Sequence, residues 1–146
     1  MDCNYDTVGK WISVLYRQFQ IYINNELKIY KLNSSQYIFL VNLYNKDGVN
    51  QEELASTLLI DKGAAARAIK QLEDNGYIIR NVNPEDKRAY KIYVTEKALS
   101  IKSEIMRILD DWNKMISSDM NKEETAILIK SLKDMSSKVL TSNNKK

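Results

Sequence analysis

Apolar residues in the first third of the chain recur at helical spacing. Between residues 10 and 27 they lie three or four positions apart, which predicts an amphipathic helix of about five turns. Residues 28–31 are expected to end it. A second helix is predicted to begin at Asn33, because Gln36 stands three positions later, as in a capping box. The run YIFLVNLY continues this helix and is apolar on nearly all sides, which is typical of a helix at the centre of a small domain.

Two further helices are predicted in the middle of the chain. Asn50 and Asp61 stand at N-cap positions before residues 51–59 and 62–75. Gly76 stands where the end of a helix favours a left-handed residue. The connection between the two helices is very short. Such a pair is typical of a helix-turn-helix, in which the second helix enters the major groove of DNA.

The period of the apolar residues then changes from about 3.6 to 2. This alternation predicts two strands, residues 77–82 and 89–94, with the segment NPEDKR as the turn between them. A hairpin in this place is interpreted as a wing. Helical spacing returns after Thr95, which is expected to cap one long helix, and after Asn121, where Glu124 completes another capping-box spacing. The last residues, TSNNKK, are expected to be frayed.

The composition agrees with a mostly helical, soluble domain. The 146 residues include only one Pro and four Gly, 44% are hydrophobic and 28% are charged. The predicted fold class is therefore mainly α with a small β-hairpin wing. No apolar stretch approaches the roughly 20 residues of a membrane span. The N-terminus lacks the pattern of a signal peptide, and a single cysteine fits a reducing compartment, so no membrane partner and a cytoplasmic location are expected.

The same composition argues against catalysis. The chain has no histidine and one cysteine, which excludes a histidine general base, a serine-type triad and most zinc sites. Adjacent acids such as Glu73 and Asp74 are interpreted as solvated surface, because neighbours in a helix do not face one another. The sequence therefore predicts neither an enzyme nor a metal or other cofactor.

The charge pattern of the second helix of the helix-turn-helix suits DNA. The formal net charge of +3 is slight, but the first turns are small and basic and the acids come only at the far end. Arg67 is predicted to contact a guanine edge, and lysines of this helix are predicted to contact phosphates. A merely solvated basic face is the alternative. The predicted outward side comprises Lys62, Gly63, Ala64, Ala66, Arg67, Lys70 and Gln71.

The predicted wing carries the pattern that resembles a known family. The segment NPEDKRAYKIYVTEKA resembles the wing of MarR-type regulators, whose hallmark is Asp-x-Arg followed by an alternating strand that ends in Leu/Val-Thr. The segment QEELASTLLIDKGAAARAIKQLEDNGYIIR is similar to the helix-turn-helix of the same family, and the resemblance extends over roughly residues 8–141. It implies that Arg88 and its neighbour Lys87 reach the minor groove, while Asp86 braces the wing. The family often has Ser or Thr where this chain has Gly63, Ala64 and Ala66.

The resemblance also implies how the chain is organised. Residues 1–31 would form an N-terminal part of a dimerisation region, residues 32–95 the winged helix-turn-helix lobe, residues 96–141 the C-terminal dimerisation helices and residues 142–146 a frayed tail. A homodimer would bind a pseudo-palindromic site on double-stranded DNA, most often as a repressor. A small aromatic or anionic effector would release it. Candidate linings of the effector site are Tyr16, Tyr37 and Trp112, although aromatics at helical spacing are also typical of a core or an interface.

Two other interpretations stay open. A winged-helix protein-interaction module without a DNA role would carry an apolar patch on the exposed side of residues 62–75. A thiol-based redox-sensing regulator would use Cys3, for which the sequence offers no basic partner to lower the pKa. The basic Arg67 and Lys70 favour the DNA-binding interpretation over the first of these.

Overall fold

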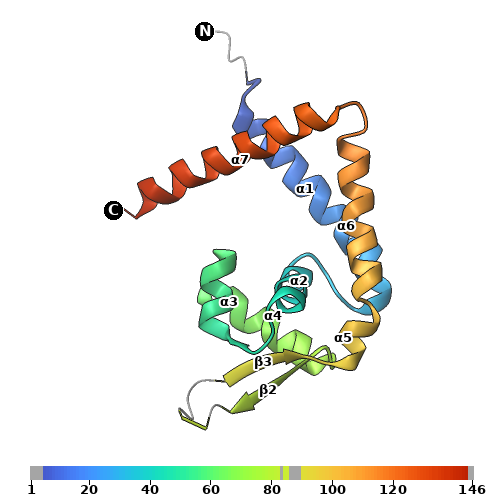
Figure 1. Ribbon diagram of the computed structural model, residues 1–146, viewed down its shortest axis with the longest axis vertical. Helices are drawn as coiled ribbons and strands as arrows, with labels where there is room; N and C mark the ends of the chain where they lie inside the picture. Colours follow the sequence, from blue (N-terminus) through green and yellow to red (C-terminus); the bar gives the residue numbers. More distant parts are fainter. Residues whose placement is uncertain (1–4, 83, 86–89, 145–146) are drawn as a thin grey trace. The chain divides into compact units, whose positions relative to one another are not determined.

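The computed structural model describes residues 5–82, 84–85 and 90–144. It is mainly helical and has a small antiparallel sheet, which confirms the predicted fold class (Figure 1). The chain forms two compact units that divide between Ile108 and Leu109. The elements are α1 (Val8–Leu27), the 3-10 helix η1 (Lys28–Tyr30), α2 (Tyr37–Asn45), β1 (Val49–Asn50), α3 (Gln51–Leu58), α4 (Lys62–Asp74), β2 (Ile78–Val82), β3 (Tyr90–Val94), α5 (Glu96–Ser100), α6 (Lys102–Ile116) and α7 (Lys122–Asn143).

Helix α2 begins later than the sequence predicted. The side chain of Asn33 accepts hydrogen bonds from the backbone N–H and the hydroxyl of Ser35, so it closes a local turn. The helix starts only at Tyr37. The predicted capping box at Asn33 is therefore wrong. Gln36 is buried and its amide donates instead to the side chain of Gln71 on α4.

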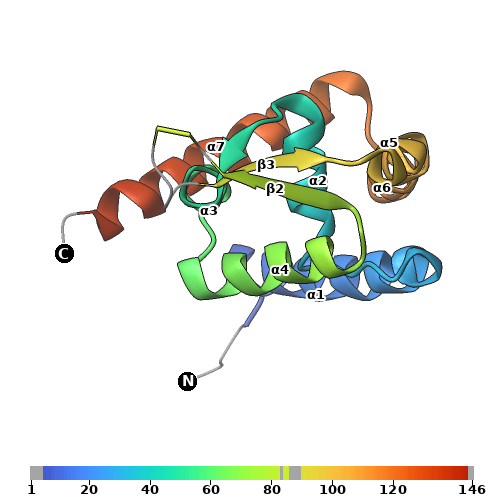
Figure 2. The ribbon, with the colours of Figure 1, turned by 90° about the horizontal axis from the view of Figure 1, so that it is seen from below.

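The sheet has one strand more than the predicted hairpin. Its order is β1-β3-β2, with Val49 opposite Ile92 and Ile78 opposite Val94. Strand β1 is only two residues long and follows Gly48, whose positive φ of 69° favours glycine and whose N–H donates to Ile92. Figure 2 shows β2 and β3 side by side with α4 along them.

The core of the first unit lies between these elements. The predicted inward face of α4 is confirmed, because Ala65, Ala68, Ile69 and Leu72 are all buried. Apolar side chains of α2, α3 and the sheet are buried with it; they are Phe39, Leu40, Leu43, Leu54, Ala55, Ile78 and Ile92. Burial of this face fixes which side of α4 remains exposed.

The predicted long helix after Thr95 is two helices. Thr95 caps α5 as expected, but the backbone of Ile101 leaves the helical region (φ −104°, ψ 1°), and α6 starts at Lys102. The capping box of Asn121 and Glu124 on α7 is confirmed. That helix runs on to Asn143 and so extends into the segment expected to be frayed. No helix within the described ranges is long and apolar enough to span a membrane.

The end of α4 is tied to η1 and α5 by side chains that donate to backbone carbonyls. Tyr77 donates to Tyr30 O at 2.6 Å, and Asn75 donates to Lys31 O at 3.2 Å. Lys97 donates to Asn75 O at 2.6 Å, and its ammonium lies 4.5 Å from the centroid of the Tyr77 ring. Burial, followed by the nearby Tyr30, raises the pKa of Tyr77. We call this set of contacts the α4 junction.

Candidate nucleic-acid interface

Helix α4 begins with a strong cap on its exposed side. The Asp61 carboxylate accepts from the backbone N–H of Gly63 at 2.8 Å and of Ala64 at 3.3 Å. Lys62 and Gly63 are exposed, and Ala64 is half-buried. The first turn of α4 therefore presents small side chains, which permit the close approach of another backbone, while Asp61 occupies the N–H groups of Gly63 and Ala64.

The cap gives a direct stability test. Replacing Asp61 with alanine leaves the N–H groups of Gly63 and Ala64 without their acceptor. We expect the free energy of unfolding to fall by about 0.5–2 kcal/mol, as measured by chemical denaturation. Asp61→Asn is the control, because asparagine caps as well as aspartate. Equal stability of Asp61→Ala and Asp61→Asn would contradict this role of the cap.

Arg67 lies one turn further along the exposed side of α4. A Cβ atom added to Gly63 would lie 3.6 Å from Nη1 of Arg67, so the guanidinium extends back over the glycine toward the start of the helix. Among the residues that the structure describes, Arg67 has no ion-pair partner. It is therefore an exposed cation that no acid of the described residues neutralises, and it lies where the sequence predicted a base contact.

The two lysines of α4 are paired with acids. Lys62 lies 3.5 Å from Glu52 on α3. Lys70 lies 2.7 Å from Asp74 and 4.0 Å from Glu73. The hydrogen bond and the charge of Asp74 raise the pKa of Lys70. Both lysines were predicted to contact phosphates. To do so, each would first have to break its ion pair with an acid of its own chain.

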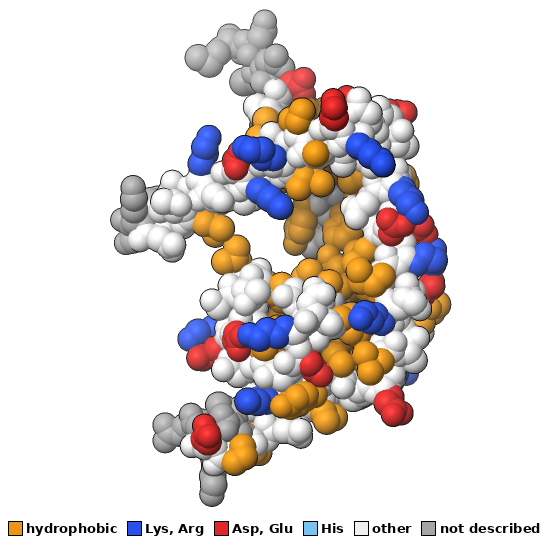
Figure 3. All heavy atoms as spheres, viewed as in Figure 1, with side chains coloured by type: hydrophobic (Ala, Val, Ile, Leu, Met, Phe, Trp, Pro, Cys, Tyr) orange, Lys and Arg blue, Asp and Glu red, His pale blue; other side chains and the backbone are white. Residues whose placement is uncertain are grey.

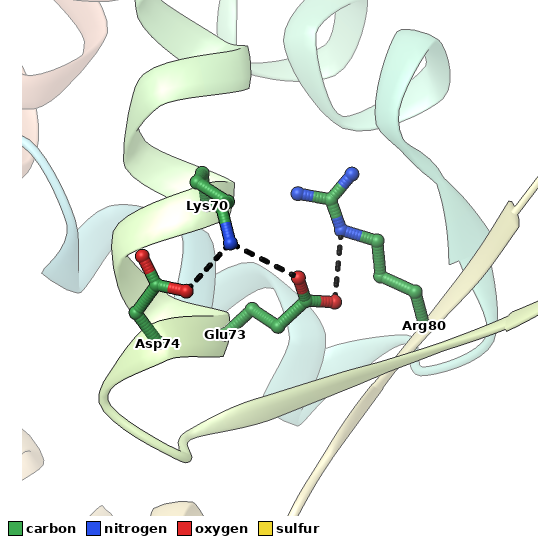
Figure 4. A network of polar contacts seen from close by, with 4 residues as sticks. All are labelled: Lys70, Glu73, Asp74 and Arg80. Atoms are coloured by element: carbon green, nitrogen blue, oxygen red, sulfur yellow. Dashed lines mark hydrogen bonds and ion pairs between the residues drawn. The ribbon is translucent and has the colours of Figure 1, made fainter.

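The sequence did not reveal that Glu73 also binds Arg80 on β2. Nε of Arg80 lies 3.1 Å from Oε2 of Glu73, so this carboxylate receives one cation from its own helix and one from the wing strand (Figure 4). Acids and cations lie beside one another over the face shown in Figure 3. Asp74 is exposed and Glu73 is half-buried, and both carboxylates form ion pairs.

Gln71 is exposed overall, but its side-chain carbonyl accepts from the buried Gln36. This contact directs the amide of Gln71 toward α2. Ala66, which was predicted on the outward side, is half-buried. Lys62, Gly63, Arg67 and Lys70 are thus exposed members of the predicted set, whereas Ala64 and Ala66 are half-buried.

The predicted wing tip lies outside the described residues. This applies to Asp86, Lys87 and Arg88, and also to Cys3 at the N-terminus. Strands β2 and β3, which lead into and out of the tip, pair in register from Ile78 opposite Val94 to Val82 opposite Tyr90.

The three aromatic candidates for an effector site do not share one environment. Tyr16 is exposed and accepts from Gln20, whereas Tyr37 is half-buried with its ring 6.0 Å from that of Phe19 in an edge-to-face contact. Burial, followed by the nearby Tyr16, raises the pKa of Tyr37. Trp112 is buried and belongs to the second unit. Within the first unit, Tyr16 and Tyr37 lie near one another.

Comparison with known proteins agrees with this geometry. A model of the MarR family matches residues 32–90. The chain is 29% identical over 128 residues to the HTH-type transcriptional regulator BilQ of Clostridioides difficile (strain CD3), which covers 88% of this chain and 86% of BilQ.

Solved structures show the same fold. A MarR transcriptional regulator from Methanosarcina mazei Go1 is 38% identical with a TM-score of 0.85, and the match covers 92% of this chain and 96% of that protein. A MarR family regulator from Listeria monocytogenes, crystallised with a 26-mer DNA, is 30% identical with a TM-score of 0.87 over 94% of this chain and 91% of its own.

Proposed function

Because this chain belongs to the MarR family of transcriptional regulators, we propose that it binds a pseudo-palindromic site on double-stranded DNA as a homodimer. Like the members of that family, it is a regulator and not an enzyme. The observation that carries the proposal is the exposed start of α4, with its capped N-terminus, its small side chains and Arg67, which forms no ion pair with any residue that the structure describes. The similar Listeria monocytogenes regulator was crystallised with DNA, which supports the same assignment.

In the proposed complex α4 enters the major groove with its N-terminal turns. Arg67 contacts base edges, and Gly63, Ala64 and Ala66 allow a close approach and contacts with thymine methyl groups. Gln71 also contacts the DNA once its side chain has given up its hydrogen bond to Gln36.

Phosphate contacts come from Lys62, Lys70 and Lys87. The wing places Arg88 in the minor groove, and Asp86 braces the wing. Two copies of α4 about 34 Å apart would occupy successive major grooves.

Exposed apolar residues of α7 support the homodimer. Leu128, Leu132, Met135 and Val139 follow one another at steps of four, three and four, so they form one stripe on the helix. None of the 22 residues of α7 is buried within the single chain. A helix with an apolar stripe requires a second surface, and another copy of α7 supplies one. We call these four residues the α7 stripe.

The domain roles follow from the same proposal. Residues 1–31 and 96–141 form the dimerisation region, and residues 32–95 form the DNA-binding lobe. Exposed apolar side chains on α1, among them Trp11, Ile12 and Leu15, are assigned to this interface as well. Repression by occluding polymerase, release by a small aromatic or anionic effector near Tyr16 and Tyr37, and a cytoplasmic location complete the proposal.

Arg67→Ala tests the proposed base contact. We expect it to weaken the specific complex by about 1–3 kcal/mol, because a bidentate contact with guanine is lost. Arg88→Ala should have an effect of similar size. The measurement is a gel shift on the DNA upstream of the chain's own gene, at two salt concentrations.

Arg107→Ala is the matched control for this experiment. It removes the same charge from an exposed arginine on α6, where Glu104 lies 2.5 Å away. It should leave the specific complex nearly unchanged. If all three variants bound like the wild type, the assignment of Arg67 and Arg88 would be wrong, and a protein-interaction module would become the better interpretation.

A further inference from the structure

Two cations form ion pairs with two acids at the last turn of α4. Lys70 bridges Asp74 at 2.7 Å and Glu73 at 4.0 Å, and Arg80 of β2 lies 3.1 Å from Glu73. Figure 4 shows the four side chains gathered between the helix and the strand. Their formal charges cancel. These four side chains therefore form a neutral cluster, beside which Lys97 of α5 donates to Asn75 O at the end of the helix.

The two ion pairs differ in how easily they can exchange partners. The side chains of Lys70 and Asp74 are 62% and 58% exposed, whereas those of Arg80 and Glu73 are 25% and 34% exposed. Exposed pairs are held weakly because water and salt screen them, so another anion can replace Asp74. The half-buried pair of Arg80 and Glu73 instead connects α4 to the wing strand. Asp74 is thus the exchangeable partner of Lys70.

Counterion release gives this exchange a measurable consequence. A lysine that neutralises a DNA phosphate normally releases about 0.9 of a bound cation from duplex DNA, and this release drives sequence-independent binding. A lysine that stays paired with a carboxylate of its own chain neutralises no phosphate and releases no cation from the duplex. Lys70 therefore contributes little to the salt dependence as long as Asp74 holds it.

We propose that Asp74 is a specificity-determining residue that restrains sequence-independent DNA binding by competing with DNA phosphate for Lys70. The inference rests on the proposed DNA-binding function. It assigns to an acid of the recognition helix the role of limiting affinity for non-operator DNA. Such a limit matters because non-operator sites in a genome greatly outnumber operators.

The test uses Asp74→Asn in the full-length protein and a duplex of scrambled sequence as the probe. Asparagine has nearly the same shape as aspartate, and loss of an acid near a helix C-terminus does not oppose folding. We expect tighter binding at low salt and a steeper plot of log affinity against log salt. The slope of this plot should steepen by about 0.9 for each protomer, or about 1.8 for a dimer. The gain in affinity of Asp74→Asn over the wild type should therefore shrink about 12-fold between about 50 and 200 mM salt.

Asp134→Asn is the matched control. Lys130 and Asp134 on α7 have the same i,i+4 spacing, a distance of 2.8 Å and exposed fractions of 78% and 59%. The variant makes the same change of net charge away from α4, and it should keep the wild-type slope. Lys70→Gln in the Asp74→Asn background should remove the gain, because the freed lysine is its source.

The outcomes separate the inference from the function on which it rests. If the wild type binds the duplex and Asp74→Asn keeps the wild-type slope, the inference is wrong and DNA binding stands. An equal effect of Asp134→Asn would also overturn the inference, since net charge alone would then explain the gain. If the wild type fails to bind duplex DNA even at low salt, the proposed function fails, and the inference with it.

Discussion

Replacing Leu132 with glutamate is expected to convert the proposed homodimer into monomers. Leu132 lies in the middle of the α7 stripe and is exposed in the single chain, so the substitution leaves the fold of the protomer intact. In the dimer the glutamate would be an unpaired charge in an apolar interface, which costs several kcal/mol. A monomer engages only one half-site, so affinity for a two-half-site DNA should fall by about 100- to 10,000-fold. Light scattering and titration of labelled DNA measure the two effects.

Ser137→Glu is the matched control for Leu132→Glu. It adds the same charge to α7, but five residues further along and on the side away from the stripe. The control should remain a dimer and bind DNA normally. A Leu132→Glu protein that stayed dimeric at micromolar concentration would show that the α7 stripe is not the interface.

Leu72→Ala is expected to lower the free energy of unfolding by about 2–5 kcal/mol. Leu72 is completely buried on the inward face of α4, and its truncation leaves a cavity against which the helix no longer packs. Urea denaturation at a fixed protein concentration measures the change, because dimerisation couples stability to concentration. Ile29→Ala is the control: Ile29 on η1 is 78% exposed, so its truncation should change stability by less than about 0.5 kcal/mol. A loss below about 1 kcal/mol for Leu72→Ala would contradict the assignment of Leu72 to the core.

Elements with local signals were predictable from the sequence. The caps at Asn50, Asp61, Thr95 and Asn121 all accept hydrogen bonds from helix N–H groups, because a cap involves only residues two or three positions apart. The inward face of α4 was also predictable, since it follows from the helical period alone.

Features that depend on competing partners were not predictable. The sequence does not show that Lys46 binds the carboxylate of Glu53 at 2.7 Å, seven positions along the chain. Strand β1 is too short to show a period of two. The break at Ile101 lacks the glycine or proline that usually marks one.

The residues of the candidate site were predictable from the sequence, but not all of their ion pairs were. The helical period correctly places Lys62, Arg67 and Lys70 on the exposed side of α4. It also allows the pair of Lys70 and Asp74, which are four positions apart. It does not show that Lys62 meets Glu52, because Glu52 comes from α3. The contrast between the paired Lys62 and Arg67, which has no ion-pair partner among the described residues, therefore required the tertiary structure.

The α4 junction divides its positions into those that evolution is free to alter and those that it is not. Each of its hydrogen bonds ends on a main-chain oxygen, which every amino acid provides. Tyr30 can thus be replaced by another residue without loss of the hydrogen bond that Tyr77 donates to its backbone oxygen. The donors Asn75, Tyr77 and Lys97 have no such freedom, and Lys31, with its φ of 55°, has a left-handed backbone conformation that favours glycine or asparagine. Homologues that keep the three donors can therefore retain this junction while diverging around it.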